Sequence, residues 1–175
     1  MKPPFLLFFI LLTGLHFHAT AQQFKTPVAY HSYILNEQQK VINTIINFSN
    51  QFNSKDSVLL ANYDKTKAIL KKSWENIQKL PPYNGDSELK DAALPLFEMY
   101  FNAMDVEYRE IVDLFIKKDF GKKTQERVNF LLNSINEREK ILDARLIVAQ
   151  ANFAKKYNLD IQNNQLQQKV NSIGK

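Results

Sequence analysis

Cysteine is absent from all 175 residues of this sequence, and its absence removes several classes of structure and chemistry. The chain has no disulfide, no thiolate ligand for a metal and no attachment point for a covalently bound haem. It also lacks the cysteine to which the lipid of a bacterial lipoprotein is joined. The fold must therefore depend on its apolar core, and a chain of this length is long enough for one domain with such a core.

Histidine is also scarce, and its three positions are His16, His18 and His31. A di-metal helical bundle needs Glu-x-x-His pairs on two helices, and a common class of hydrolase needs a Gly-x-Ser-x-Gly motif with a histidine partner. The sequence has neither motif, and His31 stands alone near the start of its expected helix. We therefore expect no metal and no cofactor, and the sequence favours a protein without catalytic activity.

The charges are nearly balanced, because 23 lysines and arginines face 18 aspartates and glutamates and leave a formal net charge of +5. The basic residues form isolated pairs, such as Lys71-Lys72 and Lys155-Lys156, with acidic residues between them. A nucleic-acid interface needs a clustered basic patch. The pattern instead predicts solvated helix faces and no nucleic-acid partner.

Only one long hydrophobic run occurs, and it lies at the N-terminus. Lys2 precedes an apolar stretch from Phe5 to Phe17, and the small residues Ala19 and Ala21 follow it. The stretch is about 13 residues long, which is too short to span a bilayer as a helix. This pattern is typical of a cleaved secretion signal. We expect residues 1–21 to be removed, with no membrane span afterwards and with export to the periplasm or the cell surface.

The rest of the chain carries apolar residues at helical spacing in four segments, at about residues 27–49, 55–80, 88–120 and 124–157. Thr26 and Pro27 are typical of a helix start, and the Pro-Pro-Tyr-Asn-Gly-Asp sequence at 81–86 is typical of a turn. Pro95 lies inside the third segment and predicts a kink near Asp91 to Pro95. The residues after Asp160 are rich in Gln and Asn.

Four amphipathic helices with short connections can bury their apolar faces only against one another. The sequence therefore predicts an all-α protein, an up-down-up-down four-helix bundle with a kinked third helix. The expected organisation is a cleaved signal at 1–21, a bundle domain at 22–160 and a polar, frayed or disordered tail at 161–175.

Several short motifs along the mature chain carry a resemblance. They are Tyr30-His-Ser-Tyr33-Ile-Leu-Asn-Glu37-Gln, Leu80-Pro-Pro-Tyr-Asn-Gly-Asp86, Asp91-Ala-Ala93 and Phe153-Ala-Lys-Lys-Tyr157. With these motifs the chain resembles a family of exported bacterial surface proteins that has no assigned activity. The resemblance implies a helical fold and an exported location, and it brings no catalytic residues.

Polar residues interrupt the apolar stripes at a few positions. Glu107 and Glu139 lie in the third and fourth stripes, at similar depths in an antiparallel pair. Two close carboxylates would suggest acid–base or cation-binding chemistry, whereas edge positions beside Arg109, Arg138 or Lys140 would make them structural ion pairs. Glu37 could likewise be a functional carboxylate or a partner of Arg145. A structural ion pair or hydrogen bond between the two is favoured.

The expected topology also gathers aromatic residues at one end of the bundle. Tyr and Trp combine an apolar body with a polar tip, as recognition surfaces do, although wide helix ends also need bulky filler. The tyrosines expected there are Tyr30, Tyr33, Tyr83, Tyr100 and Tyr157.

Together these features favour an exported binding or interaction module of the cell envelope that uses this aromatic end. Its expected partner is an envelope protein, a glycan or a small apolar ligand. The alternatives are an enzyme or cation-binding bundle that uses the mid-bundle carboxylates, and an apolar-ligand carrier.

We predict that the exported protein begins at Gln22 or at its cyclised form, because Ala19 and Ala21 fit the small-residue positions that signal peptidase reads. N-terminal sequencing of the protein recovered from the envelope checks this. Retention of the stretch from Phe5 to Phe17 would contradict the prediction and make that stretch an anchor.

Overall fold

The computed structural model describes residues 24–118 and 120–159, and these residues are almost entirely helical. The helices are α1 (Pro27–Ser49), α2 (Asp56–Lys79), α3 (Glu88–Asp105), α4 (Glu107–Ile116) and α5 (Lys122–Lys156). The all-α class is confirmed, and α3 and α4 together occupy the third helical segment expected from the sequence. The expected signal at 1–21 and tail at 161–175 lie outside the described residues.

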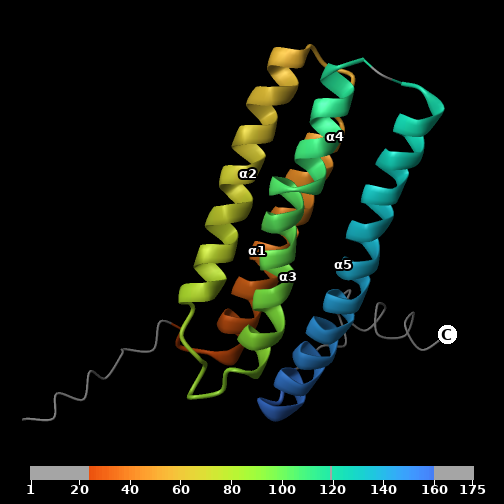
Figure 1. Ribbon diagram of the computed structural model, residues 1–175. Coiled ribbons are helices and arrows are strands. Elements are labelled where there is room, and N and C mark those ends of the chain that lie inside the picture. The colour runs from red at the N-terminus through yellow and green to blue at the C-terminus, as the bar shows by residue number, and fades with distance from the viewer. Residues whose placement is uncertain (1–23, 119, 160–175) are drawn as a thin grey trace, which may run out of the picture.

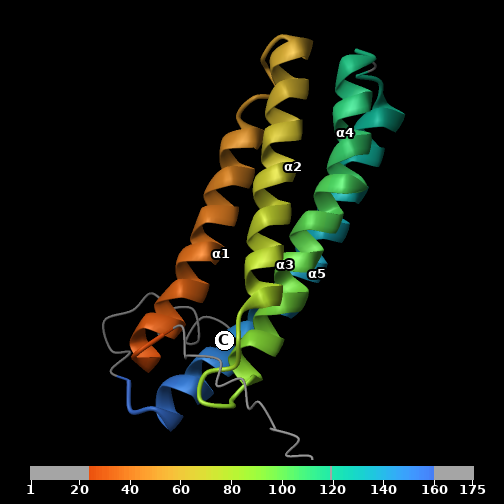
Figure 2. The ribbon, with the colours of Figure 1, turned by 90° about the vertical axis from the view of Figure 1, so that its left-hand side faces the viewer.

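The helices stand side by side as one bundle (Figure 1). The connection between α1 and α2, the C-terminal end of α4 and the start of α5 lie at one end of it. The turn at residues 81–87 and the C-terminal end of α5 lie at the other. In the perpendicular view, α1 and α4 stand on opposite sides of α2 (Figure 2).

Local sequence explains how two of these helices begin. Thr26 is the N-cap of α1, and its hydroxyl accepts a hydrogen bond from the Ala29 amide at 3.1 Å. Before α3, Tyr83 and Asp86 exchange backbone hydrogen bonds of 3.0 and 2.9 Å. The two residues between them, Asn84 and Gly85, have φ values of 49° and 81°. Asparagine and glycine tolerate this left-handed region best, so the sequence fixes the turn.

The third helical segment is interrupted at Val106, which has φ −109° and ψ −71° and separates α3 from α4. Next to the interruption, the Tyr63 hydroxyl of α2 donates a hydrogen bond to the Met104 carbonyl at 3.0 Å. The helix continues through Pro95 without an interruption, so the kink expected near Asp91 to Pro95 stays a prediction.

α3 is the central helix of the bundle. It packs along both α2 and α5 and also contacts α1, whereas α1 packs mainly along α2. Its buried residues form one broad face and are Leu89, Ala93, Leu96, Phe97, Met99, Tyr100, Ala103 and Met104. Asp91, Glu98 and Asn102 lie on the opposite side and are exposed. A face this broad has to be covered by more than one neighbouring helix.

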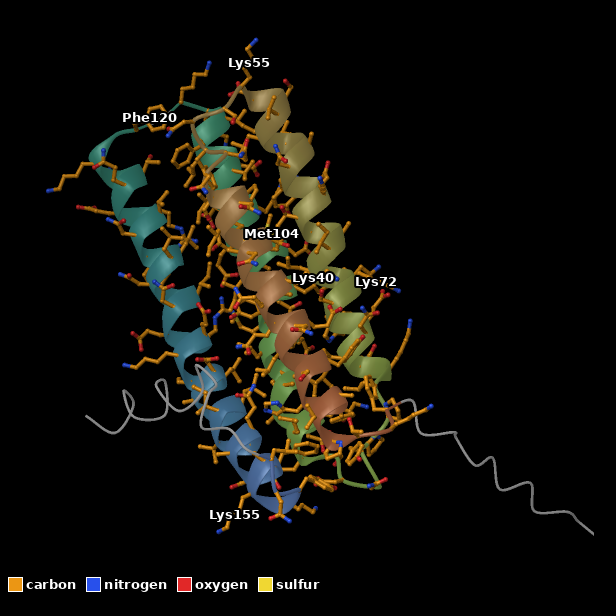
Figure 3. All side chains as sticks on the ribbon, turned by 180° about the vertical axis from the view of Figure 1, so that it is seen from behind. Lys40, Lys55, Lys72, Met104, Phe120 and Lys155 are labelled. Carbon is orange, nitrogen blue, oxygen red and sulfur yellow. The ribbon has the colours of Figure 1, made fainter. Side chains whose placement is uncertain are left out.

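α1 and α5 face each other across a seam, which is seen from behind in Figure 3 with α1 in front and α5 beside it. Their side chains meet where the rings of His31 and Phe153 stack at 6.2 Å. They meet again where the Gln38 amide donates to the Asp143 carboxylate at 2.9 Å.

None of the helices in the described part of the chain has the length and hydrophobicity needed to span a bilayer.

We predict that Tyr63→Phe lowers the free energy of unfolding by roughly 1–2 kcal/mol, because it removes the buried hydrogen bond to the Met104 carbonyl. Urea denaturation measures this loss. Tyr33→Phe is the matched control: Tyr33 is half-buried, and among the described residues its hydroxyl has no hydrogen-bond partner. The control should change stability by no more than about 0.5 kcal/mol, and equal losses in both variants would contradict the role of Tyr63.

Candidate functional site

Aromatic rings from four segments meet at the end of the bundle that holds the turn at 81–87. We call this group the aromatic end; it consists of Phe24, Tyr30, Tyr33, Tyr83, Phe153 and Tyr157. The Tyr30 ring lies 5.4 Å from that of Tyr83 and 5.7 Å from that of Phe153. The Tyr157 ring lies 5.1 Å from that of Tyr83. The structure thus brings together four of the five tyrosines that the sequence singles out.

Burial divides these rings into two kinds. Tyr30 is 1% exposed and Tyr83 is 5% exposed, so both belong to the core. Tyr33 and Tyr157 are only half-buried. The Tyr30 hydroxyl has no hydrogen-bond partner in the described part of the chain. Burial, followed by the nearby carboxylates of Asp86 and Asp91, raises the pKa of Tyr30 to about 12. Most of the ring area at this end is therefore interior packing, with two rings at its surface.

Asp86 ties the turn to the end of α5. Its carboxylate accepts hydrogen bonds from the Lys156 ammonium at 2.7 Å and the Tyr157 hydroxyl at 3.3 Å. The Glu88 amide donates to its other oxygen at 3.1 Å. Burial by itself would raise the pKa of Asp86, but these donors hold that pKa below its usual range. These contacts hold the turn at 81–87 against the C-terminal end of α5. The gathering of aromatic rings there therefore has a structural role, independent of any ligand.

Tyr100 lies away from the aromatic end. It is 4% exposed, and its hydroxyl donates to Oε1 of Glu139 at 2.6 Å. Burial, followed by the hydrogen bond to Glu139 and its charge, raises the pKa of Tyr100. Tyr100 therefore stays protonated and serves as a hydrogen-bond donor to the carboxylate.

The other charged residues singled out in the stripes have separate partners. The Arg138 guanidinium pairs with Glu107, so the two mid-bundle carboxylates engage different groups. Glu37 pairs with Lys40 at 3.3 Å rather than with Arg145. Arg145 lines a shallow groove between α3 and α5, beside Arg138.

A cavity of about 220 Å³ opens in the seam between α1 and α5. We call it the seam cavity. Its α1 wall is apolar, its inner walls come from α3 and α4, and its α5 wall is partly polar. The lining residues are Ile42, Ile45, Ile46, Tyr100, Ala103, Tyr108, Ile135, Asn136 and Glu139.

Glu139 is the one charged side chain in this lining. One of its oxygens accepts the Tyr100 hydroxyl, and no described residue donates to the other. Burial and the charge of Glu139 also raise the pKa of Tyr108, which lines the same cavity. The seam cavity therefore combines an apolar wall with a half-satisfied carboxylate, the arrangement of a small-molecule site.

Sequence reasoning singled out Glu139 and Tyr100 but not the cavity between them and α1. Ile42 and Ile46 are four residues apart and form a second apolar row on α1, beside the main stripe. Ile46 is 52% exposed even though it is apolar. That second row is the sequence signal for the cavity wall, but the width of the seam depends on tertiary packing.

Comparison with known proteins assigns no function to this site. No protein-family model, no curated protein and no solved structure matches this chain. Within the described residues, no group of three or more His, Cys, Asp or Glu side chains is placed to hold a metal ion.

We predict that His31 makes stability depend on pH. His31 is 4% exposed, its Nε2 has no partner, and burial lowers its pKa from 6.5. The unfolded chain therefore takes up a proton first as the pH falls. The stability from the neutral ring is present above the ordinary pKa and is lost as the pH falls through and below it.

The wild type should thus lose more free energy of unfolding than His31→Phe between about pH 7 and pH 5. The phenylalanine keeps the stacking on Phe153 but cannot titrate in this range. Chemical denaturation at each pH measures the difference. If the free energies of unfolding of the two proteins instead changed in parallel with pH, the pKa of His31 would be the same in the folded and unfolded states, and the prediction would be wrong.

Proposed function

We propose that this protein is an exported binding module of the cell envelope, without catalytic activity, that holds a small ligand in the seam cavity. One observation carries the proposal: the cavity between α1 and α5 joins an isoleucine wall to a carboxylate that the Tyr100 hydroxyl holds in place. Binding sites of this type are mostly apolar, with a few fixed polar groups that set the orientation of the ligand.

The size of the cavity indicates the size of the ligand. An apolar cavity of about 150 Å³ is enough to take up benzene. At about 220 Å³, the seam cavity has room for one substituted ring or a short branched chain. A small ligand with an apolar body and one polar group is therefore the best match.

Export and topology are part of the same proposal. The signal-like pattern at residues 1–21 and the resemblance to exported surface proteins support a location outside the cytoplasm. The placement of the connections at two ends of the bundle supports an up-down-up-down order. Pro95 within α3 supports the kinked third helix.

A second candidate function uses the aromatic end as a docking surface for an envelope protein or a glycan. The half-buried rings of Tyr33 and Tyr157 favour it, together with the buried polar atoms of Tyr30 and His31, which have no hydrogen-bond partner among the described residues. An enzyme or cation-binding bundle is the remaining alternative, and Glu139 is the carboxylate that it would use.

We predict that benzyl alcohol, a neutral ring with one hydroxyl, binds the purified protein saturably at one site per chain. Isothermal titration calorimetry measures this binding. Ile46→Trp should abolish it, because the larger ring at this half-exposed position extends over the cavity. Val148→Trp, at an α5 position that is 60% exposed and outside the cavity lining, is the matched control.

Circular dichroism establishes that both variants remain helical. The proposal is contradicted if none of benzyl alcohol, benzylammonium and benzoate binds saturably. It is also contradicted if Ile46→Trp binds as the wild type does, because the site would then lie elsewhere.

A further inference from the structure

The polar wall of the seam cavity carries charge of one sign. Of the lining residues, α1 contributes isoleucines, α3 contributes Tyr100 and Ala103, and α4 contributes Tyr108. α5 contributes Glu139 as the one ionised group, with the neutral amide of Asn136 one turn away. No lysine or arginine lines the cavity.

Among the described residues, no ion pair neutralises Glu139. Arg138, its neighbour in the chain, pairs with Glu107 and donates to the Ser134 carbonyl. The described structure shows Glu139 with one hydrogen bond, from a neutral hydroxyl, and with no ion pair. One turn further along the same face, Asp143 adds a second carboxylate, which accepts the Gln38 amide.

This local field differs from that of the whole molecule. The chain has a formal net charge of +5, so its overall field attracts anions rather than cations. A preference for a cation in the seam cavity must therefore come from Glu139, the one charged residue of its lining. The tyrosine rings in the lining add electron-rich surface, which also favours a cation over a neutral group.

We propose that the ligand of the seam cavity is a small primary amine with an apolar body, whose ammonium group donates to the free carboxylate oxygen of Glu139. The apolar body lies against Ile42, Ile45 and Ile46, and the Tyr100 hydroxyl keeps the carboxylate aimed at the ammonium. This inference rests on the proposed function, because it specifies the ligand of the same cavity. Charge-assisted hydrogen bonds are the strong ones, so the ammonium group dominates the selectivity.

Three ring compounds of nearly the same size test the charge preference: benzylammonium, benzyl alcohol and benzoate. Calorimetry at pH 7 and low salt should give a dissociation constant about tenfold lower for benzylammonium than for benzyl alcohol, and the weakest binding for benzoate. Glu139→Gln should remove the difference between the two ligands, so that benzylammonium binds no more tightly than benzyl alcohol does to the same variant.

Glu137→Gln is the matched control. Glu137 is an exposed glutamate on the same helix, and it does not line the cavity. The Glu137→Gln substitution removes the same charge from the molecule and should leave the preference for benzylammonium intact. Equal loss of preference in both variants would show a general field effect and overturn the role of Glu139.

The remaining outcomes separate the two claims. If benzyl alcohol binds as tightly as benzylammonium and Ile46→Trp blocks both, the cavity is a ligand site but the amine inference is wrong. A preference for benzylammonium that persists in Glu139→Gln also overturns the inference. Absence of saturable binding for all three compounds removes both the proposed function and the inference built on it.

Discussion

The burial of α3 is the constraint on which the rest of the structure depends. Its broad apolar face needs more than one neighbour to cover it, and α1, α2 and α5 supply them. Each outer helix gains its main contacts from α3 or from its sequence neighbour. α1 and α5 are therefore held in position without close packing along their whole length, and the seam between them remains wide enough for a cavity.

The same central helix explains why the third segment is divided. α3 is anchored deep in the bundle, and α4 departs from it at Val106. At that point the Tyr63 hydroxyl of α2 donates to the Met104 carbonyl, and Lys67, also of α2, pairs with Asp105. Two polar side chains of α2 therefore contact the segment in which α3 ends.

Local patterns in the sequence were enough to predict the helices and their connections. Helical periodicity, the Thr26 cap and the Asn84-Gly85 turn all act within a few residues, and the helical class follows from them. The interruption at Val106 was not predicted. The hydrogen bond beside it joins Tyr63 to Met104, 41 positions apart in the sequence, so no local pattern records it. The aromatic end was partly foreseen: Tyr30 and Tyr83 converge as expected, but the depth of their burial depends on packing that no local pattern records.

The candidate site shows the same division. Glu139 stood out because a carboxylate interrupted an apolar stripe, and Tyr100 stood out as an aromatic residue. Their hydrogen bond and the isoleucine wall opposite them arise only when α1, α3 and α5 are assembled. A polar interruption in a stripe is therefore a useful signal for a site, but its partners have to be found in the assembled fold.

The most direct measurement of the central claim is the methyl spectrum of the isoleucines in ¹³C-labelled protein during a titration with benzylammonium. If the seam cavity is the ligand site, the methyl signals of Ile42, Ile45, Ile46 and Ile135 should shift together and saturate at one ligand per chain. The signals of Ile69 and Ile77 on α2, which do not line the seam cavity, should stay in place. Shifts confined to the α2 isoleucines, or no saturable shift at any isoleucine, would contradict the account.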